Sequence, residues 1–194
     1  MAIDRSQVIS QLSQIKIKGD SNGMVPAFGV LVQQLPANFW NSFSEKILDA
    51  AGDALYDDAE GLLENAAAEC GYHTGYGIIT SEEFNSVVGP MIENKPEDIL
   101  HGAYGVFTAW GWANAEITEL VPGEKMVVRA YDYYESDVKN PKKPFAYMIR
   151  GVSRAFMDLA YSDPYPKGFG KFKCEQTKAI EKGDKYGEFV VTKA

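Results

Sequence analysis

The chain has 194 residues, of which 45% are hydrophobic and 24% are charged, and its formal net charge is -8 at pH 7. This length and composition are typical of one globular domain. The negative charge argues against binding to nucleic acid or to anionic lipid, because both need a basic surface. We therefore expect no nucleic-acid partner and no membrane partner.

The chain start lacks the apolar core of a signal peptide, and no stretch approaches the roughly 18 apolar residues of a membrane-spanning helix. Cys70 and Cys174 are far apart, and neither belongs to a CxxC pair. This spacing argues against a disulfide framework and against a thiolate zinc site. The expected location is the cytoplasm.

Residues 1–24 are expected to form an N-terminal extension, consisting of a weak helix and a glycine-containing loop. A single domain is expected to span residues 25–194. Its first element is a short apolar run, Phe28 to Val32, which lies between prolines and predicts a strand.

Helical spacing of apolar residues predicts the elements that follow. Residues 40–51 place one apolar face on a helix, and a second helical stretch is expected from Ala54 to about Cys70. Three glycines then interrupt the pattern, which indicates either close packing against another helix or a loop. They are Gly71, Gly75 and Gly77.

Two further helix starts are readable from capping residues. Ser81, followed by two glutamates, predicts a helix that ends near Gly89. Pro96 opens the next helix, whose apolar face includes Val106 and Trp110.

From Ala113 the apolar period changes to that of strands. Alternation on both sides of a Pro122-Gly123 turn predicts a β-hairpin. A long amphipathic helix from Phe145 to Leu159 follows, and on its polar side Arg154 and Asp158 are spaced to pair.

A second hairpin closes the chain, with one strand at about 172–180 and the other at about 186–192. The predicted fold class is therefore α+β. An antiparallel sheet of two hairpins, plus the N-terminal strand, packs against several helices.

Three C-terminal segments carry a family resemblance: GWANAEI at 111–117, FAYMIRG at 145–151 and QTKAIEKGDKYGEF at 176–189. They resemble the 4-vinyl reductase family, whose closing pattern is E-x-x-C-x-x-x-G-D-x-x-C-x-F. The likeness covers roughly residues 105–192. It implies a fold of the 4-vinyl reductase type, which is also similar to that of subunits of the TRAPP transport complex that bind an acyl chain.

The zinc site of that family does not carry over. The resemblance implies four ligand positions, one at the start of the long helix and three in the closing pattern. They hold Ala146, Gln176, Ala179 and Gly187, none of which binds zinc as a thiolate or a carboxylate. We therefore expect no metal and no cofactor. Residues 161–170 look like an insertion that replaces the metal as a brace or covers a pocket.

The resemblance implies a homodimer and a pocket for a small aromatic or apolar ligand between helices and sheet. In phenol-sensing members a His and a Trp contact the ligand. The alternative is that these aromatic side chains simply fill an ordinary hydrophobic core and bind no ligand. The ligand-binding candidates here are His101, Tyr104, Phe107, Trp110, Trp112 and Tyr147.

An enzyme on the same scaffold is the alternative, acting on a small organic substrate as a hydrolase, a lyase or a reductase-associated protein. Its candidate catalytic residues are His101, His73 and Cys70, together with a Tyr. Cys70 and His73 share one face if they lie on a helix, although a free buried thiol is commonly inert. A third hypothesis is an interaction subunit of a larger complex.

Overall fold

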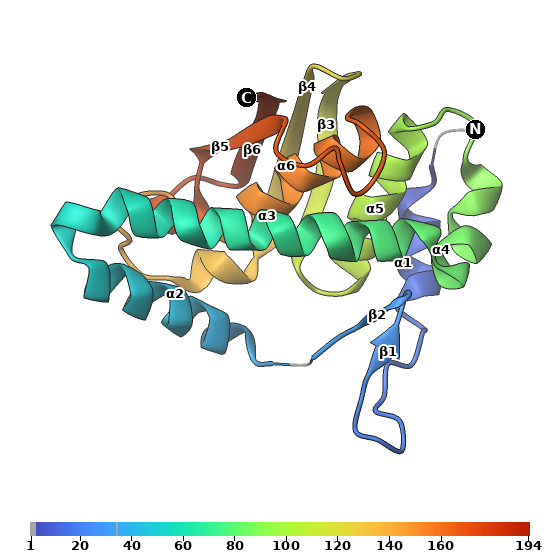
Figure 1. Cartoon of the computed structure of the whole chain (residues 1–194), viewed down its shortest axis with the longest axis horizontal. Coiled ribbons are helices and arrows are strands. Elements are labelled where there is room, and N and C mark those ends of the chain that lie inside the picture. The colour runs from blue at the N-terminus through green and yellow to red at the C-terminus, as the bar shows by residue number, and fades with distance from the viewer. Residues whose placement is uncertain (1–2, 34) are drawn as a thin grey trace.

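The computed structural model describes residues 3–33 and 35–194 (Figure 1). Its helices are α1 (Arg5–Leu12), α2 (Ala37–Ala51), α3 (Tyr56–Thr80), α4 (Glu82–Val87), α5 (Glu97–Ala109) and α6 (Tyr147–Tyr161). Its strands are β1 (Pro26–Ala27), β2 (Val30–Leu31), β3 (Ala113–Val121), β4 (Lys125–Tyr133), β5 (Phe172–Lys178) and β6 (Gly187–Lys193). Within these ranges no helix is long and apolar enough to cross a bilayer.

The main sheet is antiparallel with the order β3-β4-β6-β5, so the two predicted hairpins are joined through β4 and β6. Val128 in the centre of β4 pairs with Ile117 on one side and with Phe189 on the other. The predicted α+β class and its antiparallel sheet are confirmed.

The molecule is built in layers, which Figure 1 shows from the helical side. Helices α5 and α6 pack on the sheet, and α3 packs on α6. The largest cluster of buried side chains lies between the sheet and α5 and α6, and includes Tyr104, Phe156 and Phe189. Helix α6 is therefore covered on both sides.

Covering α6 on both sides changes the expected role of its polar face. Arg154 and Asp158 are buried, not solvated. Arg154 donates to Asn65 and pairs with Glu64 of α3, so its expected pairing with Asp158 is wrong. Asp158 instead accepts backbone N–H bonds from Gly170 and its neighbour Lys171, which fixes the end of the loop after α6, where the sequence suggests an insertion at 161–170.

The glycine-rich stretch is part of a helix. Helix α3 does not end near Cys70 as expected but continues to Thr80. A β-carbon at position 71 would lie 3.0 Å from Val152 of α6, and one at position 75 would lie 2.9 Å from Leu159. Close packing against another helix, the first of the two interpretations, is thus the reason for Gly71 and Gly75, whereas Gly77 packs against Val30 of β2.

The N-terminal segment packs into the body. Val8 and Leu12 of α1 are buried in a cluster with Phe28. The guanidinium of Arg5 donates two bonds to the carbonyl oxygen of Ala115 in β3, at 3.0 and 3.2 Å.

The predicted N-terminal strand takes a different form. Phe28 and Gly29, with φ values of 50° and 70°, form the turn of a short hairpin, and only Val30–Leu31 of the predicted run is a strand. Strands β1 and β2 therefore pair only with each other and form a separate two-stranded sheet.

Candidate functional site

A pocket of about 590 Å³ lies between the N-terminal segment and the helices α3, α5 and α6. The start of α2 reaches the same pocket through Trp40. A volume of this order is typical of sites that hold a drug-sized organic molecule.

The wall of the pocket is apolar. Three tryptophans line it with two phenylalanines and many aliphatic side chains. The aliphatic contributors are Leu12, Ile15, Ile17, Leu31, Val32, Ile78, Ile79, Ile99, Leu100, Ala103, Val106, Ala109, Val152, Leu159 and Ala160.

A few polar side chains interrupt this wall, and among the described residues that line it there is no Asp, Glu, Lys, Arg or His. Cys70 and Thr74 contribute from α3, with their Sγ and Oγ1 atoms 3.7 Å apart. Ser13 and Gln33 contribute from the N-terminal segment. The pocket thus offers weak hydrogen bonding but no counter-charge.

Three of the predicted ligand-binding residues line the pocket: Phe107, Trp110 and Trp112. The rings of Phe107 and Trp112 lie 5.6 Å apart. Trp110 packs edge-to-face against Phe28, with ring centroids 4.5 Å apart. Its indole Nε1–H is buried without a hydrogen-bond partner in the described part of the chain.

The other three predicted ligand-binding residues lie outside the lining. Tyr104 is buried and donates to Ser153 at 2.8 Å, and burial raises the pKa of its phenol. Tyr147 belongs to a separate cluster, where its ring lies 4.9 Å from that of Phe145. His101 is half-buried, and this burial lowers its pKa, although the nearby Asp98 carboxylate opposes the effect.

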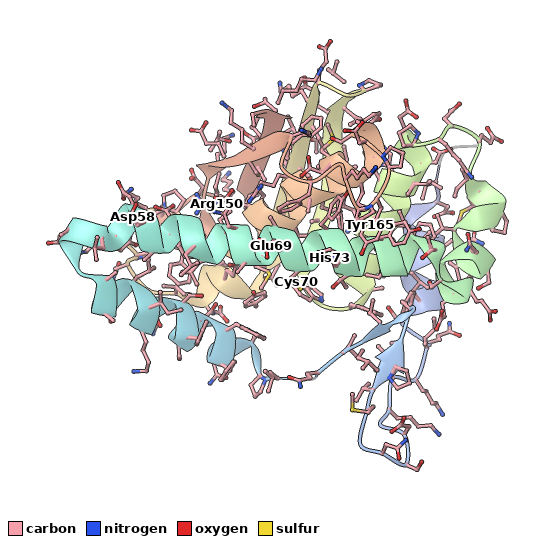
Figure 2. The ribbon with its side chains drawn as sticks, in the orientation of Figure 1. Asp58, Glu69, Cys70, His73, Arg150 and Tyr165 are labelled. Atoms are coloured by element: carbon pink, nitrogen blue, oxygen red, sulfur yellow. The ribbon has the colours of Figure 1, made fainter. Side chains whose placement is uncertain are left out.

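The structure separates the two residues of the proposed thiol–imidazole pair. Cys70 lines the pocket, whereas His73, less than one turn along α3, lies outside the lining (Figure 2). The His73 Nδ1 atom lies 2.9 Å from the hydroxyl of Tyr165 in the inserted loop. The Tyr165 ring stacks on Tyr76 with centroids 4.0 Å apart. This inserted loop is therefore attached to the outer side of α3.

Sequence reasoning missed the contribution of the N-terminal segment and of α2. The alternation of Ile15 and Ile17 with lysines was a usable signal, since it is the pattern of a segment with one apolar side. The sequence places Trp40 on the apolar face of its helix and gives no sign that it also lines a pocket. Its place on the pocket wall depends on where α2 lies, which no local pattern records.

A hydrogen-bonded cluster stands at the positions that the 4-vinyl reductase resemblance marks as zinc ligands. Gln176 accepts from the Ala146 amide at 3.1 Å and donates to Glu181 at 3.0 Å. The Tyr133 hydroxyl donates to Glu181, and its ring would collide with a β-carbon at Gly187, at 2.7 Å. A phenol, a carboxamide and a carboxylate thus link the strands to the start of α6.

The described residues contain no group of three or more His, Cys, Asp or Glu side chains placed to hold a metal ion. One carboxylate close to the cluster is deeply buried. Glu135 accepts from the amides of Met148 and Ile149 at 2.9 and 3.3 Å. Burial nevertheless raises the pKa of Glu135 to about 8.

No protein-family model matches the chain, and no curated protein sequence matches it. Solved structures do share its fold. The phenol-responsive sensory domain of the transcription activator PoxR, crystallised with phenol, matches with a TM-score of 0.73 at 11% identity, covering 100% of this chain and 92% of that one.

Two other structures are similar over most of their length. Trafficking protein particle complex subunit 3 from Naegleria fowleri, covalently bound to palmitic acid, has a TM-score of 0.57 at 19% identity, covering 81% of this chain and 92% of that one. A vinyl-4-reductase family protein from Methanocaldococcus jannaschii has a TM-score of 0.50 at 14% identity, covering 84% of each chain. The chain therefore has the fold that these three proteins share.

Proposed function

We propose that this protein binds an uncharged, apolar organic molecule in the pocket between its N-terminal segment and α3, α5 and α6. The observation that carries the proposal is the composition of the wall, which is apolar and, in the part of the chain that the structure describes, holds no Asp, Glu, Lys, Arg or His side chain. An ionised ligand would lose its hydration there without gaining a counter-charge. A neutral apolar ligand gains about 25 cal/mol for each Å² that it removes from water.

The volume of the pocket restricts the choice of ligand further. A single aromatic ring leaves most of about 590 Å³ unfilled, and unfilled space forfeits dispersion contacts. The ligand that fits best is an extended or polycyclic molecule. Phe107, Trp110 and Trp112 flank one part of it, and a polar end of the ligand lies near Cys70 and Thr74.

The decisive experiment is a titration with the neutral fluorophore N-phenylnaphthylamine, which becomes emissive in apolar surroundings. We expect saturable binding with one site for each chain. Thr74→Trp fills the pocket from α3 and is expected to weaken binding about tenfold or more, a loss of about 1.4 kcal/mol. Glu69→Trp adds the same ring at an exposed position of α3 outside the lining and leaves binding unchanged. Equal effects of the two variants, or no saturable binding, contradict the proposal.

A long acyl chain is a second candidate ligand, favoured by the position of one thiol. Cys70 is exposed and lines the apolar pocket, while Cys174 of β5 is buried in the core between the sheet and the helices. The similar subunit from Naegleria fowleri is covalently bound to palmitic acid. In this protein the Cys70 thiol would attack the carbonyl carbon of an acyl-coenzyme A, and the coenzyme would leave as its free thiol. The chain would then occupy the pocket.

Membership of the 4-vinyl reductase family, assembly as a homodimer and a cytoplasmic location belong to the same proposal. The vinyl-4-reductase family protein that shares the fold supports the first of them. Of the three candidates named for the enzyme alternative, Cys70 lines the pocket, whereas His73 and His101 lie outside the lining. Substrate turnover that Cys70→Ser abolishes would favour it.

A further inference from the structure

An apolar stripe runs along α2, and only its C-terminal half is packed. Trp40, Phe43, Ile47 and Ala51 recur at the spacing that places side chains on one helix face. Ile47 and Ala51 pack against the buried cluster that links α2 to α3. The side chains at the other end remain open to solvent: Trp40 is 39% and Phe43 47% exposed.

The unpacked half of the stripe borders the ligand pocket. Trp40 is part of the pocket wall, together with Cys70 and Thr74 of α3. Figure 1 shows α2 meeting α3 at their shared corner and diverging from it toward the start of α2. Trp40 thus belongs to the end of α2 that lies away from this corner, and Phe43 follows it by less than one helical turn.

The start of α2 is held to the body by few contacts. Pro36 precedes the helix without a side-chain capping bond, and residues 37–40 are all exposed. Asn41 donates to the carbonyl oxygen of Tyr134 at 2.8 Å, which ties that half of the helix to the body. At the other end the helix stops at Gly52, whose φ is 64°, and the last turns are held by the buried side chain of Leu48.

We propose that the N-terminal half of α2 is a lid, which closes on an apolar ligand by tilting toward the pocket from the packed C-terminal half and covering the pocket with Trp40 and Phe43. The inference rests on the proposed function, since the ligand supplies the surface on which the lid closes. Exposed aromatic area is costly in water. A ligand in the pocket extends the apolar wall toward α2, so closure buries both surfaces together.

The first test is amide hydrogen exchange of the full chain, measured by mass spectrometry with and without saturating N-phenylnaphthylamine. We expect exchange in residues 41–47 to slow about fivefold or more when the fluorophore is bound, because closure adds protecting contacts. Unchanged exchange there under conditions in which the fluorescence titration saturates overturns the lid and leaves the proposed function standing. If no saturable binding is observed, both the lid and the proposed function are contradicted.

A concentration series separates the lid from a docking surface. Protection that appears without fluorophore and grows with protein concentration would mean that a second copy of the chain covers the stripe, and would overturn the proposal. Protection that depends on the fluorophore and not on protein concentration supports it.

A matched pair of variants tests the role of Trp40. Trp40→Ala removes the pocket-lining ring of the lid, and Phe39→Ala removes a ring of similar exposure on the same turn outside the lining. We expect Trp40→Ala to speed dissociation of N-phenylnaphthylamine about tenfold, since a lid acts mainly on the rate of escape. Phe39→Ala changes it less than about twofold by the same argument. Equal effects would overturn the lid.

Discussion

Gly151 of α6 lies so close to Glu64 of α3 that a β-carbon at position 151 would be 2.5 Å from the Glu64 carbonyl oxygen. The contact is with helix backbone, which cannot rotate away as a side chain does. It sets the separation of the two helices that carry much of the pocket wall.

Gly151→Ala therefore forces α3 and α6 apart and is expected to lower the free energy of unfolding by about 3 kcal/mol. Gly61→Ala is the control, because position 61 is also helical but its added methyl meets nothing within 4 Å. That change is expected to stabilise the protein by about 0.5–1 kcal/mol. Urea denaturation of both variants measures the difference, and a neutral effect of Gly151→Ala would contradict the close contact.

The hydrogen-bonded cluster of Tyr133, Gln176 and Glu181 predicts that removing the Tyr133 hydroxyl lowers the free energy of unfolding. The Tyr133 hydroxyl donates to Glu181 and accepts from Gln176 and from the Ile180 amide. Tyr133→Phe leaves these groups without a partner, which is expected to cost about 1–3 kcal/mol of unfolding free energy.

Tyr131→Phe is the matched control for this hydroxyl, since Tyr131 is exposed and donates to Glu116 at the surface. Its expected effect is within about 0.5 kcal/mol. Thermal unfolding of the two variants side by side compares them. Similar losses would show that the buried cluster contributes no more than a surface hydrogen bond.

The buried carboxyl of Glu135 predicts how stability depends on pH. Burial raises its pKa to about 8 in the folded protein, against an ordinary value of 4.5. Between these values the folded protein holds a proton that the unfolded chain has released. The free energy of unfolding therefore falls as pH rises from about 5 to about 8.

Glu135→Gln isolates this contribution. The carboxamide still accepts from the start of α6 but does not titrate, so the fall of stability with pH becomes shallower than in the original protein. Burial also raises the pKa of Glu64 and of Asp158, and both remain in the variant, so only the difference between the two curves reports Glu135. Denaturation at several pH values gives both curves, and parallel curves would contradict the raised pKa.

The positions of the two thiols predict selective acylation. With palmitoyl-coenzyme A at neutral pH we expect one palmitoyl group to be added at Cys70, which lines the pocket. Cys174 is buried, and burial raises the pKa of its thiol. Intact-mass measurement before and after hydroxylamine detects the thioester.

Cys70→Ser abolishes this product, and Cys174→Ser leaves it unchanged. Acylation that persists in Cys70→Ser would remove the acyl candidate. It would not affect reversible binding of a neutral ligand, which the fluorescence titration measures separately.

The regular elements of the C-terminal part were predictable because their signals are local. Alternation in β3 and β4, the apolar stripe of α6 and the Ser81 cap of α4 each reside in a few consecutive residues. The continuation of α3 was not predictable in the same way. Gly71 and Gly75 weaken a helix on their own, and only their contacts with α6 show what they provide.

The candidate site was predictable in part for the same reason. Phe107, Trp110 and Trp112 are an aromatic group at a predicted junction of helix and strand, and they line the pocket. The opposite wall comes from residues 12–33 and Trp40. Their apolar side chains are readable in the sequence, but their place depends on how the N-terminal segment crosses α5, which is a matter of tertiary packing.

The bond between Arg5 and Ala115 joins residues that are 110 positions apart. During synthesis α1 leaves the ribosome long before α5 exists, so Val8 and Leu12 at first lack the surface on which they dock, which includes Val106. Closing so long a loop is slow, and contacts of this kind form late in folding. The wall to which α1 contributes is thus completed only after α5 has been made, and a nascent chain that stalls before α5 leaves Val8 and Leu12 without their packing partners.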